Sequence, residues 1–351
     1  MKRFKQLLAL GLSLTLLAAC APKEAEATPT PEPTPTPVES AAPTPTPADK
    51  VQVNVAMLKG TTGLGACKLM DDAGKGETAN DYTFTLLGEG SEAVAALSNG
   101  TADIAALPTN LASTLYHKLD GGVQLLCLNT LGVLYILENG ETISEVADLK
   151  GKTIHAFGQG ANPEYVLNYL LEKNGLTAGE DVTVEWHAAT DEVSALVASG
   201  EAEVAMLPVP AATTAVIQSQ GKARFALDLS EEWEKAGAEG VLTMGCAVVR
   251  TAFAQEHPEA VEAFLAEYGA SIAYMSDEAN LDAAAALAES CGIIPKAAVA
   301  KKALPDANLC FITGDEMIDG IQGYYQVLFA ANPASIGGSI PDGAFYYNYQ
   351  S

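Results

Sequence analysis

The sequence contains an internal repeat at an offset of 100 residues. Ser91–Pro108 aligns without gaps with Asp191–Pro208, and seven of the eighteen positions are identical. Each copy has the pattern of a helix that ends at a glycine, followed by a short buried strand that ends at a proline. Gly60 and Gly160 keep the same offset further upstream, each between a predicted strand and a predicted helix. The repeat therefore predicts two similar α/β lobes.

Strand and helix patterns alternate around both copies. In the first copy, Val51–Met57, Tyr82–Leu87 and Asp103–Leu107 have the apolar patterning of strands. In the second, a strand at Thr153–Phe157 precedes a helix at Pro163–Glu172. This strand-helix-strand order predicts mostly parallel sheets.

Two apolar runs, Val123–Leu137 and Val241–Arg250, are predicted to cross between the lobes. Closure of the lobes would be a hinge motion of the crossings Cys127–Tyr135 and Thr243–Val249. The helices that begin at Pro258 are predicted to return and pack on the first lobe. These boundaries assign residues 51–130 and 247–351 to the first lobe and residues 131–246 to the second.

The first twenty residues have the pattern of an export signal. Lys2, Arg3 and Lys5 precede the apolar stretch Leu7–Leu17, which is too short to span a membrane. The sequence Leu-Ala-Ala-Cys that ends at Cys20 resembles the lipobox of bacterial lipoproteins. Residues 1–19 are thus predicted to be a signal peptide and Cys20 to be lipidated. An ordinary secretory signal with a chance cysteine is the alternative.

Residues 20–50 are rich in proline and threonine, a composition that cannot bury a core and favours polyproline II. They are predicted to be a semi-rigid tether between the lipid and the globular part. A disordered region with no selected length is the alternative.

Charge and motifs exclude several classes of function. Nineteen Lys and Arg against 44 Asp and Glu give a net charge of −25, which disfavours nucleic-acid binding. The sequence has no Gly-x-Ser-x-Gly nucleophile elbow, and the nearest stretch, Gly269–Ala273, lies inside a predicted helix. The histidines are isolated and none lies in a His-Glu-x-x-His frame: they are His117, His155, His187 and His257. We therefore predict no catalytic residues, no metal and no cofactor.

The best candidates for binding are two glycine-rich turns, Lys59–Gly65 and Gly158–Asn162. Each lies between the carboxyl end of a strand and the start of a helix, where free N–H groups favour polar ligands. The alternative is that the glycines only make tight turns. The predicted ligand-binding residues of both lobes are Lys59, Thr61, Thr62, Gly63, Thr109, Asn110, Asn129, Thr130, Gly160, Asn162 and Pro210.

The nature of the ligand is constrained by the scarcity of arginine after Cys20. Only Arg224 and Arg250 follow it, and Arg250 is expected to form a structural ion pair. A neutral, zwitterionic or heteroaromatic solute is therefore favoured over a simple anion, although Lys59 could supply a positive charge. Several aromatic side chains could stack on a ring, although the core is the commoner place for them: Tyr116, Tyr135, Phe157, Tyr165 and Trp186. Cys291 and Cys310 could pair, because they alone lie in loop-like contexts of one region.

The sequence resembles substrate-binding lipoproteins of ABC transporters, which have the type II periplasmic binding protein fold. The resemblance is to the branch that binds nitrate, sulfonates and thiamine precursors. Its motifs are Asp148–Thr153, Ala198–Glu201 with Leu207-Pro208, Ala247–Arg250 with His257–Val261, and the ending Asn332–Tyr347. The resemblance implies capture of a small organic solute and its delivery to an ABC permease and its ATPase. It also implies a lipid-anchored location on the extracytoplasmic face of the membrane.

Two other functions stay open at this point. One is an exported transferase or lyase that uses the same cleft, and the other is a surface receptor without transport. The same branch includes pyrimidine-forming enzymes with a cysteine-rich iron-binding motif, and nothing in this sequence matches that motif.

Overall fold

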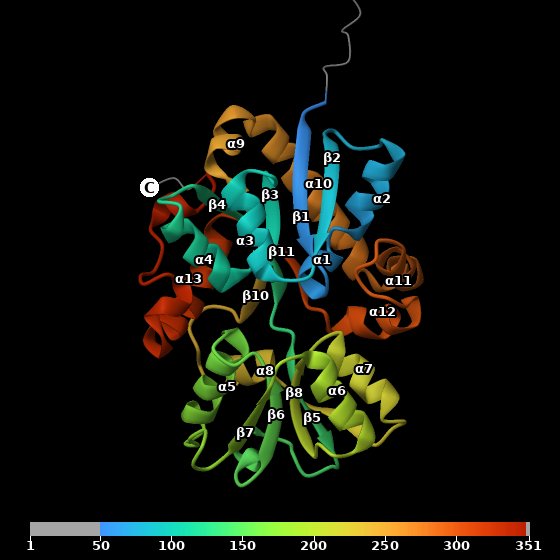
Figure 1. The fold of residues 1–351 in the computed structure, drawn as a ribbon, viewed down its shortest axis with the longest axis vertical. Coiled ribbons are helices and arrows are strands. Elements are labelled where there is room, and N and C mark those ends of the chain that lie inside the picture. Colours follow the sequence, from blue (N-terminus) through green and yellow to red (C-terminus); the bar gives the residue numbers. More distant parts are fainter. Residues whose placement is uncertain (1–49, 349–351) are drawn as a thin grey trace, which may run out of the picture. The chain divides into compact units, whose positions relative to one another are not determined.

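Two mixed β-sheets form the framework of residues 50–348, the part of the chain that the computed structural model describes (Figure 1). The first sheet has the strand order β11-β4-β10-β3-β1-β2 and the second has the order β7-β6-β8-β5-β9. The chain passes to the second sheet between β4 and β5 and returns between β9 and β10. The predicted fold, two α/β lobes joined by two crossings, is confirmed. The signal peptide, Cys20 and the tether through Asp49 lie outside the described residues.

The strands of each lobe have the following bounds. The first sheet contains β1 (Gln52–Leu58), β2 (Asp81–Leu87), β3 (Ile104–Pro108), β4 (Val123–Leu131), β10 (Thr243–Arg250) and β11 (Leu309–Ile312). The second contains β5 (Leu134–Asn139), β6 (Thr153–Phe157), β7 (Thr183–His187), β8 (Val204–Pro208) and β9 (Ala223–Asp228).

Both sheets contain more antiparallel pairing than the prediction of mostly parallel sheets allowed. β2, β1 and β3 pair in parallel, as do β7, β6 and β8. β10 is antiparallel to both β3 and β4, and β5 is antiparallel to both β8 and β9. The reason is the path of the chain: β5 and β10 each enter their sheet directly from the other lobe, and therefore run opposite to their neighbours.

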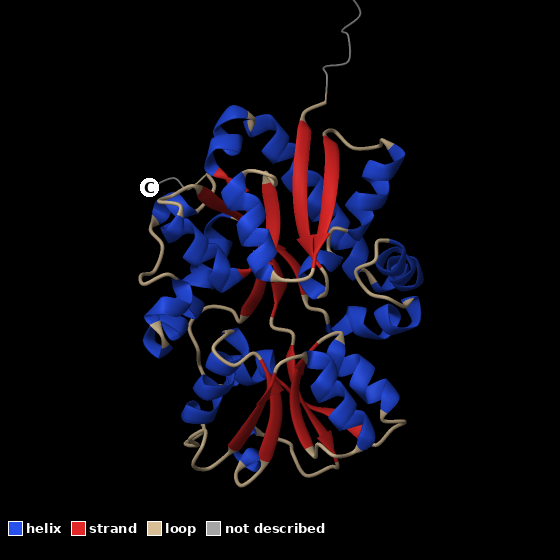
Figure 2. Cartoon of the chain, viewed as in Figure 1, coloured by secondary structure: helices blue, strands red, loops and turns tan. Residues whose placement is uncertain are grey.

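Helices cover both faces of each sheet (Figure 2). The first lobe has α1 (Thr61–Leu64), α2 (Cys67–Lys75), α3 (Gly90–Asn99) and α4 (Thr109–Lys118). The second lobe has α5 (Asn162–Lys173), α6 (Thr190–Ser199), α7 (Ala211–Gln218) and α8 (Leu229–Lys235). After β10 come α9 (Thr251–Glu256), α10 (Pro258–Ser276), α11 (Leu281–Ser290), α12 (Ala297–Ala303) and α13 (Gly314–Ala331).

The internal repeat corresponds to α3–β3 in the first lobe and α6–β8 in the second. Gly100 and Gly200 end the two helices in the left-handed conformation, with φ of 77° and 86°. A side chain is disfavoured in that conformation, so glycine is the expected residue at both caps. The repeat thus encodes the same helix-turn-strand unit twice.

The C-terminal helices return to the first lobe, as predicted. Val261, Phe264 and Tyr268 of α10 pack with Val53 of β1, and α13 packs against α4 and β4 through its buried tyrosines. α12 also contributes to a core cluster that includes Leu207 of the second lobe. No helix among residues 50–348 combines the length and the hydropathy needed to cross a membrane.

The first crossing is shorter than the predicted hinge segment Cys127–Tyr135, and the second lies before the predicted one. The first is Gly132-Val133, between β4 and β5. A Cβ atom at Gly132 would lie 2.2 Å from the Ser230 Oγ atom, so the crossing has no room for a side chain there. The predicted second hinge, Thr243–Val249, is instead part of β10 and paired with β3 and β4. The chain returns through the loop before β10, and Thr243–Cys246 therefore belong to the first sheet rather than to the second lobe.

Candidate functional site

The strand register places the glycine-rich turns of both lobes at the edges beside the crossings. Pro108 at the end of β3 pairs with Gly245, near the start of the returning strand β10. Pro208 at the end of β8 pairs with Leu134, the first residue after the first crossing. Because β1 runs parallel to β3 and β6 runs parallel to β8, the turns after β1 and β6 lie at these same edges. Figure 1 shows α1 at the end of β1 that faces the second lobe.

In the first lobe, the turn after β1 is fixed by close packing. Thr61 and Gly63 are buried within α1, and Thr62 is partly buried. A Cβ atom at Gly63 would lie 2.0 Å from the Leu58 carbonyl oxygen, so only glycine fits at this position. Lys59 is exposed, and no ion pair to it is found among the described residues.

Hydrogen bonds connect the other first-lobe candidates to one another. The Thr109 and Thr243 hydroxyls lie 3.4 Å apart, and the Thr243 hydroxyl donates to the Thr130 carbonyl oxygen at 3.3 Å. The Thr130 hydroxyl donates to the Asn129 Oδ1 atom, and the Asn129 Nδ2 atom donates to the Tyr268 hydroxyl, both at 3.0 Å. All five residues are at most 1% exposed, and burial raises the pKa of Tyr268. The network gives Asn129 and Thr130 a structural role in joining β4, β10 and α10.

Asn110 lies away from this network. Its Nδ2 atom donates to the Ser335 carbonyl oxygen at 3.3 Å, in the C-terminal segment. The prediction grouped Asn110 with Thr109 because they are adjacent in the sequence. They are the first two residues of α4, and the structure directs their polar groups to different partners.

In the second lobe, the turn after β6 is more open. Gly160 has a φ of 73°, a Cβ atom there would meet nothing within 4 Å, and its N–H donates to the Glu164 carboxylate. Asn162, the first residue of α5, is only 4% exposed, and its Oδ1 atom has no hydrogen-bond partner among the described residues. A buried amide oxygen without a partner is costly, so it is a natural acceptor for a ligand. Pro210 immediately precedes α7, in which the buried Thr213 hydroxyl likewise has no partner within residues 50–348.

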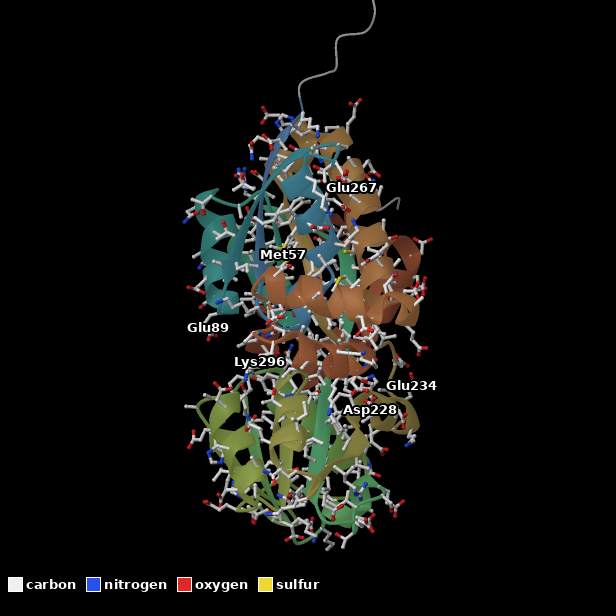
Figure 3. The ribbon with its side chains drawn as sticks, turned by 90° about the vertical axis from the view of Figure 1, so that its right-hand side faces the viewer. Met57, Glu89, Asp228, Glu234, Glu267 and Lys296 are labelled. Atoms are coloured by element: carbon white, nitrogen blue, oxygen red, sulfur yellow. The ribbon has the colours of Figure 1, made fainter. Side chains whose placement is uncertain are left out.

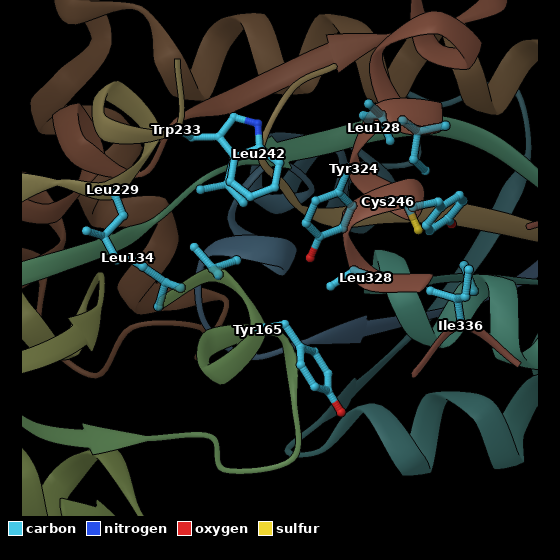
Figure 4. Close-up of a cluster of buried hydrophobic side chains, with 14 of the residues drawn as sticks. Leu128, Leu134, Tyr165, Leu229, Trp233, Leu242, Cys246, Tyr324, Leu328 and Ile336 are labelled. Atoms are coloured by element: carbon cyan, nitrogen blue, oxygen red, sulfur yellow. The ribbon is translucent and has the colours of Figure 1, made fainter. Parts of the chain in front are cut away.

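Three further polar groups at the junction of the lobes were missed by the sequence reasoning. Ser230 Oγ and Trp233 Nε1 on α8, and the Tyr324 hydroxyl on α13, are buried without a hydrogen-bond partner in the described chain. The rings of Trp233 and Tyr324 have centroids 5.9 Å apart and belong to one cluster (Figure 4). Burial raises the pKa of Tyr324, which therefore stays a neutral donor. The only signal in the sequence was that Trp233 is one of two tryptophans.

A groove of about 600 Å³ lies between α5 of the second lobe and α13. Its volume is in the range of small-molecule pockets. Tyr165, Tyr169 and Gln326 are among its lining residues, whereas the glycine-rich turns are not. Tyr165 connects the groove with the turn after β6. Its hydroxyl donates to the Gly160 carbonyl oxygen and accepts from the Asn332 Nδ2 atom, both at 3.0 Å.

Two other aromatic candidates, Tyr116 and Tyr135, have structural partners. The Tyr116 hydroxyl donates to the Asp342 carboxylate at 2.6 Å, and burial together with this contact raises the pKa of Tyr116 to about 12. The Tyr135 hydroxyl donates to the Asp306 carbonyl oxygen at 3.1 Å.

Figure 3 shows Asp228, at the end of β9, and Lys296, just before α12, close to the level at which the lobes meet.

Arg224 and Arg250, the two arginines of the described residues, form ion pairs with buried carboxylates, as expected for Arg250. The Arg250 guanidinium lies 2.6 Å from Asp103, and that of Arg224 lies 2.7 Å from Glu138. Neither arginine is therefore free to hold an anionic ligand.

The possible pairing of Cys291 with Cys310 is wrong. All five described cysteines are free, and Cys291 contacts Cys67 instead, its Sγ atom lying 3.6 Å from the Cys67 carbonyl oxygen. A hydrogen bond with the Cys67 side chain lowers the pKa of Cys291 to about 7. The reason is that α11 packs on α2, a contact that the loop-like sequence context did not reveal.

The expectation that the histidines are isolated is also wrong for two of them. Strand pairing between β6 and β7 brings His155 and His187 within 3.1 Å of each other.

Comparison with known proteins agrees with this architecture. The profile of the NMT1/THI5-like family matches residues 85–279, and the chain belongs to this family. A search of curated proteins finds no match.

Solved structures share the fold at low identity. A structure described as an ABC transporter from Parabacteroides distasonis superimposes with a TM-score of 0.71 at 19% identity, over 86% of this chain and 100% of that one. The periplasmic aliphatic sulphonate binding protein SsuA of Escherichia coli gives 0.64 at 17% identity, over 83% and 92%. The alkanesulfonate-binding protein SsuA of Xanthomonas axonopodis pv. citri, bound to MOPS, gives 0.57 at 19% identity, over 81% and 94%. The chain therefore has the fold of solute-binding proteins of ABC importers.

Proposed function

We propose that this protein is the extracytoplasmic solute-binding component of an ABC importer. The observation that carries the proposal is the convergence of the turns after β1, β3, β6 and β8 on the edges beside the two crossings. A solute held by both sets of turns would contact both lobes at once. Such a ligand stabilises a closed arrangement through contacts that an open arrangement lacks. The closed form is the state that would dock on the permease.

The polar groups of the site support a neutral, zwitterionic or heteroaromatic solute. Arg224 and Arg250 are both paired, and Glu164 occupies the Gly160 N–H at the start of α5. A simple anion would meet this carboxylate in place of a free donor. The unpartnered Oδ1 atom of Asn162 provides an acceptor at the turn of the second lobe, which suits a ligand that carries a hydrogen-bond donor.

Binding without turnover fits these groups better than catalysis. The candidate turns present amides, hydroxyls and glycines, and an enzyme would require an acid and a base positioned on the same substrate. The proposed role of the protein is therefore capture and delivery, with no cofactor.

The function can be tested by offering the full-length protein a panel of solutes and measuring affinity by calorimetry. The panel contains taurine, ethanesulfonate, nitrate, a thiamine-type aminopyrimidine and several amino acids. We expect a zwitterionic or heteroaromatic member to bind, and Asn162→Leu to weaken its binding about tenfold, the worth of one lost hydrogen bond. A double Thr61→Val, Thr62→Val variant should weaken binding without unfolding the protein.

Asn168→Leu is the matched control, because Asn168 lies on the same helix but lines the groove between α5 and α13. If Asn168→Leu weakens binding while Asn162→Leu and the threonine variant do not, the groove is the binding site and the proposed site is wrong. Failure of every solute class to bind would contradict the proposed function itself.

We also propose that the protein is anchored through lipid on Cys20, followed by the proline-rich tether. The lipobox-like sequence supports this, and two or more acyl chains would anchor the protein stably. Cys20→Ser should abolish labelling with a palmitate analogue and leave uncleaved or released protein. Continued labelling of the variant would contradict the anchor.

A further inference from the structure

Three groups that commonly bind metals lie together on one face of the second sheet. His155 is on β6, and Glu185 and His187 are on the neighbouring edge strand β7. The parallel register pairs His155 with Glu185 and Phe157 with His187. Because alternate residues of a strand point to the same face, all three side chains project from one side of the sheet. One ligand atom from each residue lies within 4.8 Å of the other two.

The distances between these atoms match those around a tetrahedral metal ion. The His155 Nδ1 atom lies 3.1 Å from the His187 Nε2 atom and 3.4 Å from a Glu185 carboxylate oxygen. Zinc binds imidazole nitrogen and carboxylate oxygen at about 2.0–2.2 Å, which separates neighbouring ligand atoms of a tetrahedron by about 3.3–3.5 Å. We propose that His155, Glu185 and His187 form a binding site for a divalent transition metal, with Zn²⁺ as the best match. This proposal replaces the sequence-based expectation of no metal.

A fourth residue orients one of the histidines as metal sites require. The Nδ1 atom of His187 lies 3.1 Å from a Glu192 carboxylate oxygen, in the first turn of α6. A carboxylate that accepts this N–H leaves the Nε2 atom of the same ring unprotonated and directed at the metal. Glu192 comes from a different element than the three ligands, so the second contact is independent of the pairing between β6 and β7.

The two histidine rings of the site are mostly buried, whereas its carboxylates are open to solvent. The His155 and His187 side chains are 16% and 15% exposed, so their rings are held by packing. The Glu185 and Glu192 side chains are 55% exposed, which leaves solvent access for an ion and for a water molecule as fourth ligand. The net charge of −25 would also attract a cation.

The site does not depend on the proposed solute binding. Its ligands lie on β6 and β7, and none is among the residues proposed to hold a solute. Loss of metal binding and loss of solute binding would therefore be separate results.

The test is calorimetric titration of the full-length, chelator-treated protein with ZnCl₂. A separate sample of the metal-free protein is titrated with Co²⁺. We expect one site, with Co²⁺ absorption bands typical of tetrahedral coordination. His155→Gln and His187→Gln should each remove this site. Glu192→Gln should weaken zinc binding about tenfold, as is usual for a group that orients a ligand.

His117→Gln, at a half-buried histidine of the first lobe, is the matched control and should bind zinc like the original protein. Circular dichroism establishes that each variant is folded. If a histidine variant fails to fold, Glu185→Gln and Glu192→Gln test the same site through exposed side chains. The proposal is overturned if the original protein does not bind zinc at micromolar concentrations, or if the folded variants bind it unchanged.

Discussion

The two lobes share a scaffold but differ in how their polar groups are satisfied. In the first lobe, Thr109, Asn129 and Thr130 are bound into a buried hydrogen-bond network. In the second lobe, Asn162 and Thr213 are buried at helix starts with a polar atom unpartnered within the described chain. The repeat therefore preserves the helix-turn-strand unit, but similar backbone scaffolds do not give the candidate polar side chains of the two lobes similar partners. On this account the candidate residues of the first lobe are held by internal hydrogen bonds, whereas those of the second lobe have unmet ones.

The largest effect is expected from the two buried arginine–carboxylate ion pairs, one in each lobe. Arg224 joins β9 to Glu138 of β5, and Arg250 joins β10 to Asp103, just before β3. Glu138 is 1% exposed, so Arg224→Met should lower the free energy of unfolding by about 3 kcal/mol because a buried carboxylate loses its ion-pair partner. Denaturant unfolding of Arg224→Met and Arg250→Met tests this. Equal stability of both variants and the original protein would show that neither lobe depends on its arginine ion pair.

The contribution of the Arg224–Glu138 ion pair to stability also depends on pH. Burial opposes ionisation of Glu138, but hydrogen bonds from Thr142, Ile143 and Arg224 outweigh it and lower its pKa. A lowered pKa gives stability that is present above the unfolded value, about 4.3, and is lost as the pH falls through the folded value. In Arg224→Met the folded pKa of Glu138 should rise toward its unfolded value, so less stability should be lost as the pH falls below about 4.3. An unchanged pH dependence of the unfolding free energy would contradict the assigned cause.

A smaller effect is expected from glycines in the equivalent turns. Gly63→Ala should cost about 2 kcal/mol, because the new methyl group would meet the Leu58 carbonyl oxygen. Gly160→Ala has free space, and its cost of about 1 kcal/mol comes only from its φ of 73°. Thermal unfolding of the two variants measures the difference. A larger loss in Gly160→Ala would reverse the assignment of the first lobe as the tightly packed half.

The smallest effects are expected from the asparagines. Asn129→Ala should lower the free energy of unfolding by about 1–2 kcal/mol, because the Tyr268 hydroxyl and the Thr130 hydroxyl lose a partner. Asn162→Ala should leave it unchanged or raise it, because the variant no longer buries an oxygen that makes no hydrogen bond in the described structure. Similar losses in both variants would remove the distinction between the lobes.

Sequence patterns predicted the helices and strands well, because these depend mainly on residues that are neighbours in the chain. The caps at Gly100 and Gly200 and the helix start at Pro163 follow from backbone preferences that a few neighbouring residues determine. The antiparallel direction of β10 was missed because it depends on the path of the chain through the other lobe.

Side-chain partners were harder to predict than elements. The contact of Cys291 with Cys67 and that of His155 with His187 join residues on different elements. No spacing along the chain encodes such contacts. The candidate turns were placed correctly at the crossings, but whether a polar group there is free or paired, as for Asn162 and Asn129, depends on packing from distant helices.

Hydrogen exchange of the full-length protein, with and without the tightest-binding solute of the panel, tests the central claim most directly. The account predicts that the solute slows exchange of backbone amides in both turns, Lys59–Gly65 of the first lobe and Gly158–Asn162 of the second. Slowed exchange confined to one lobe, or to the groove between α5 and α13, would contradict capture of the solute between the two sets of turns.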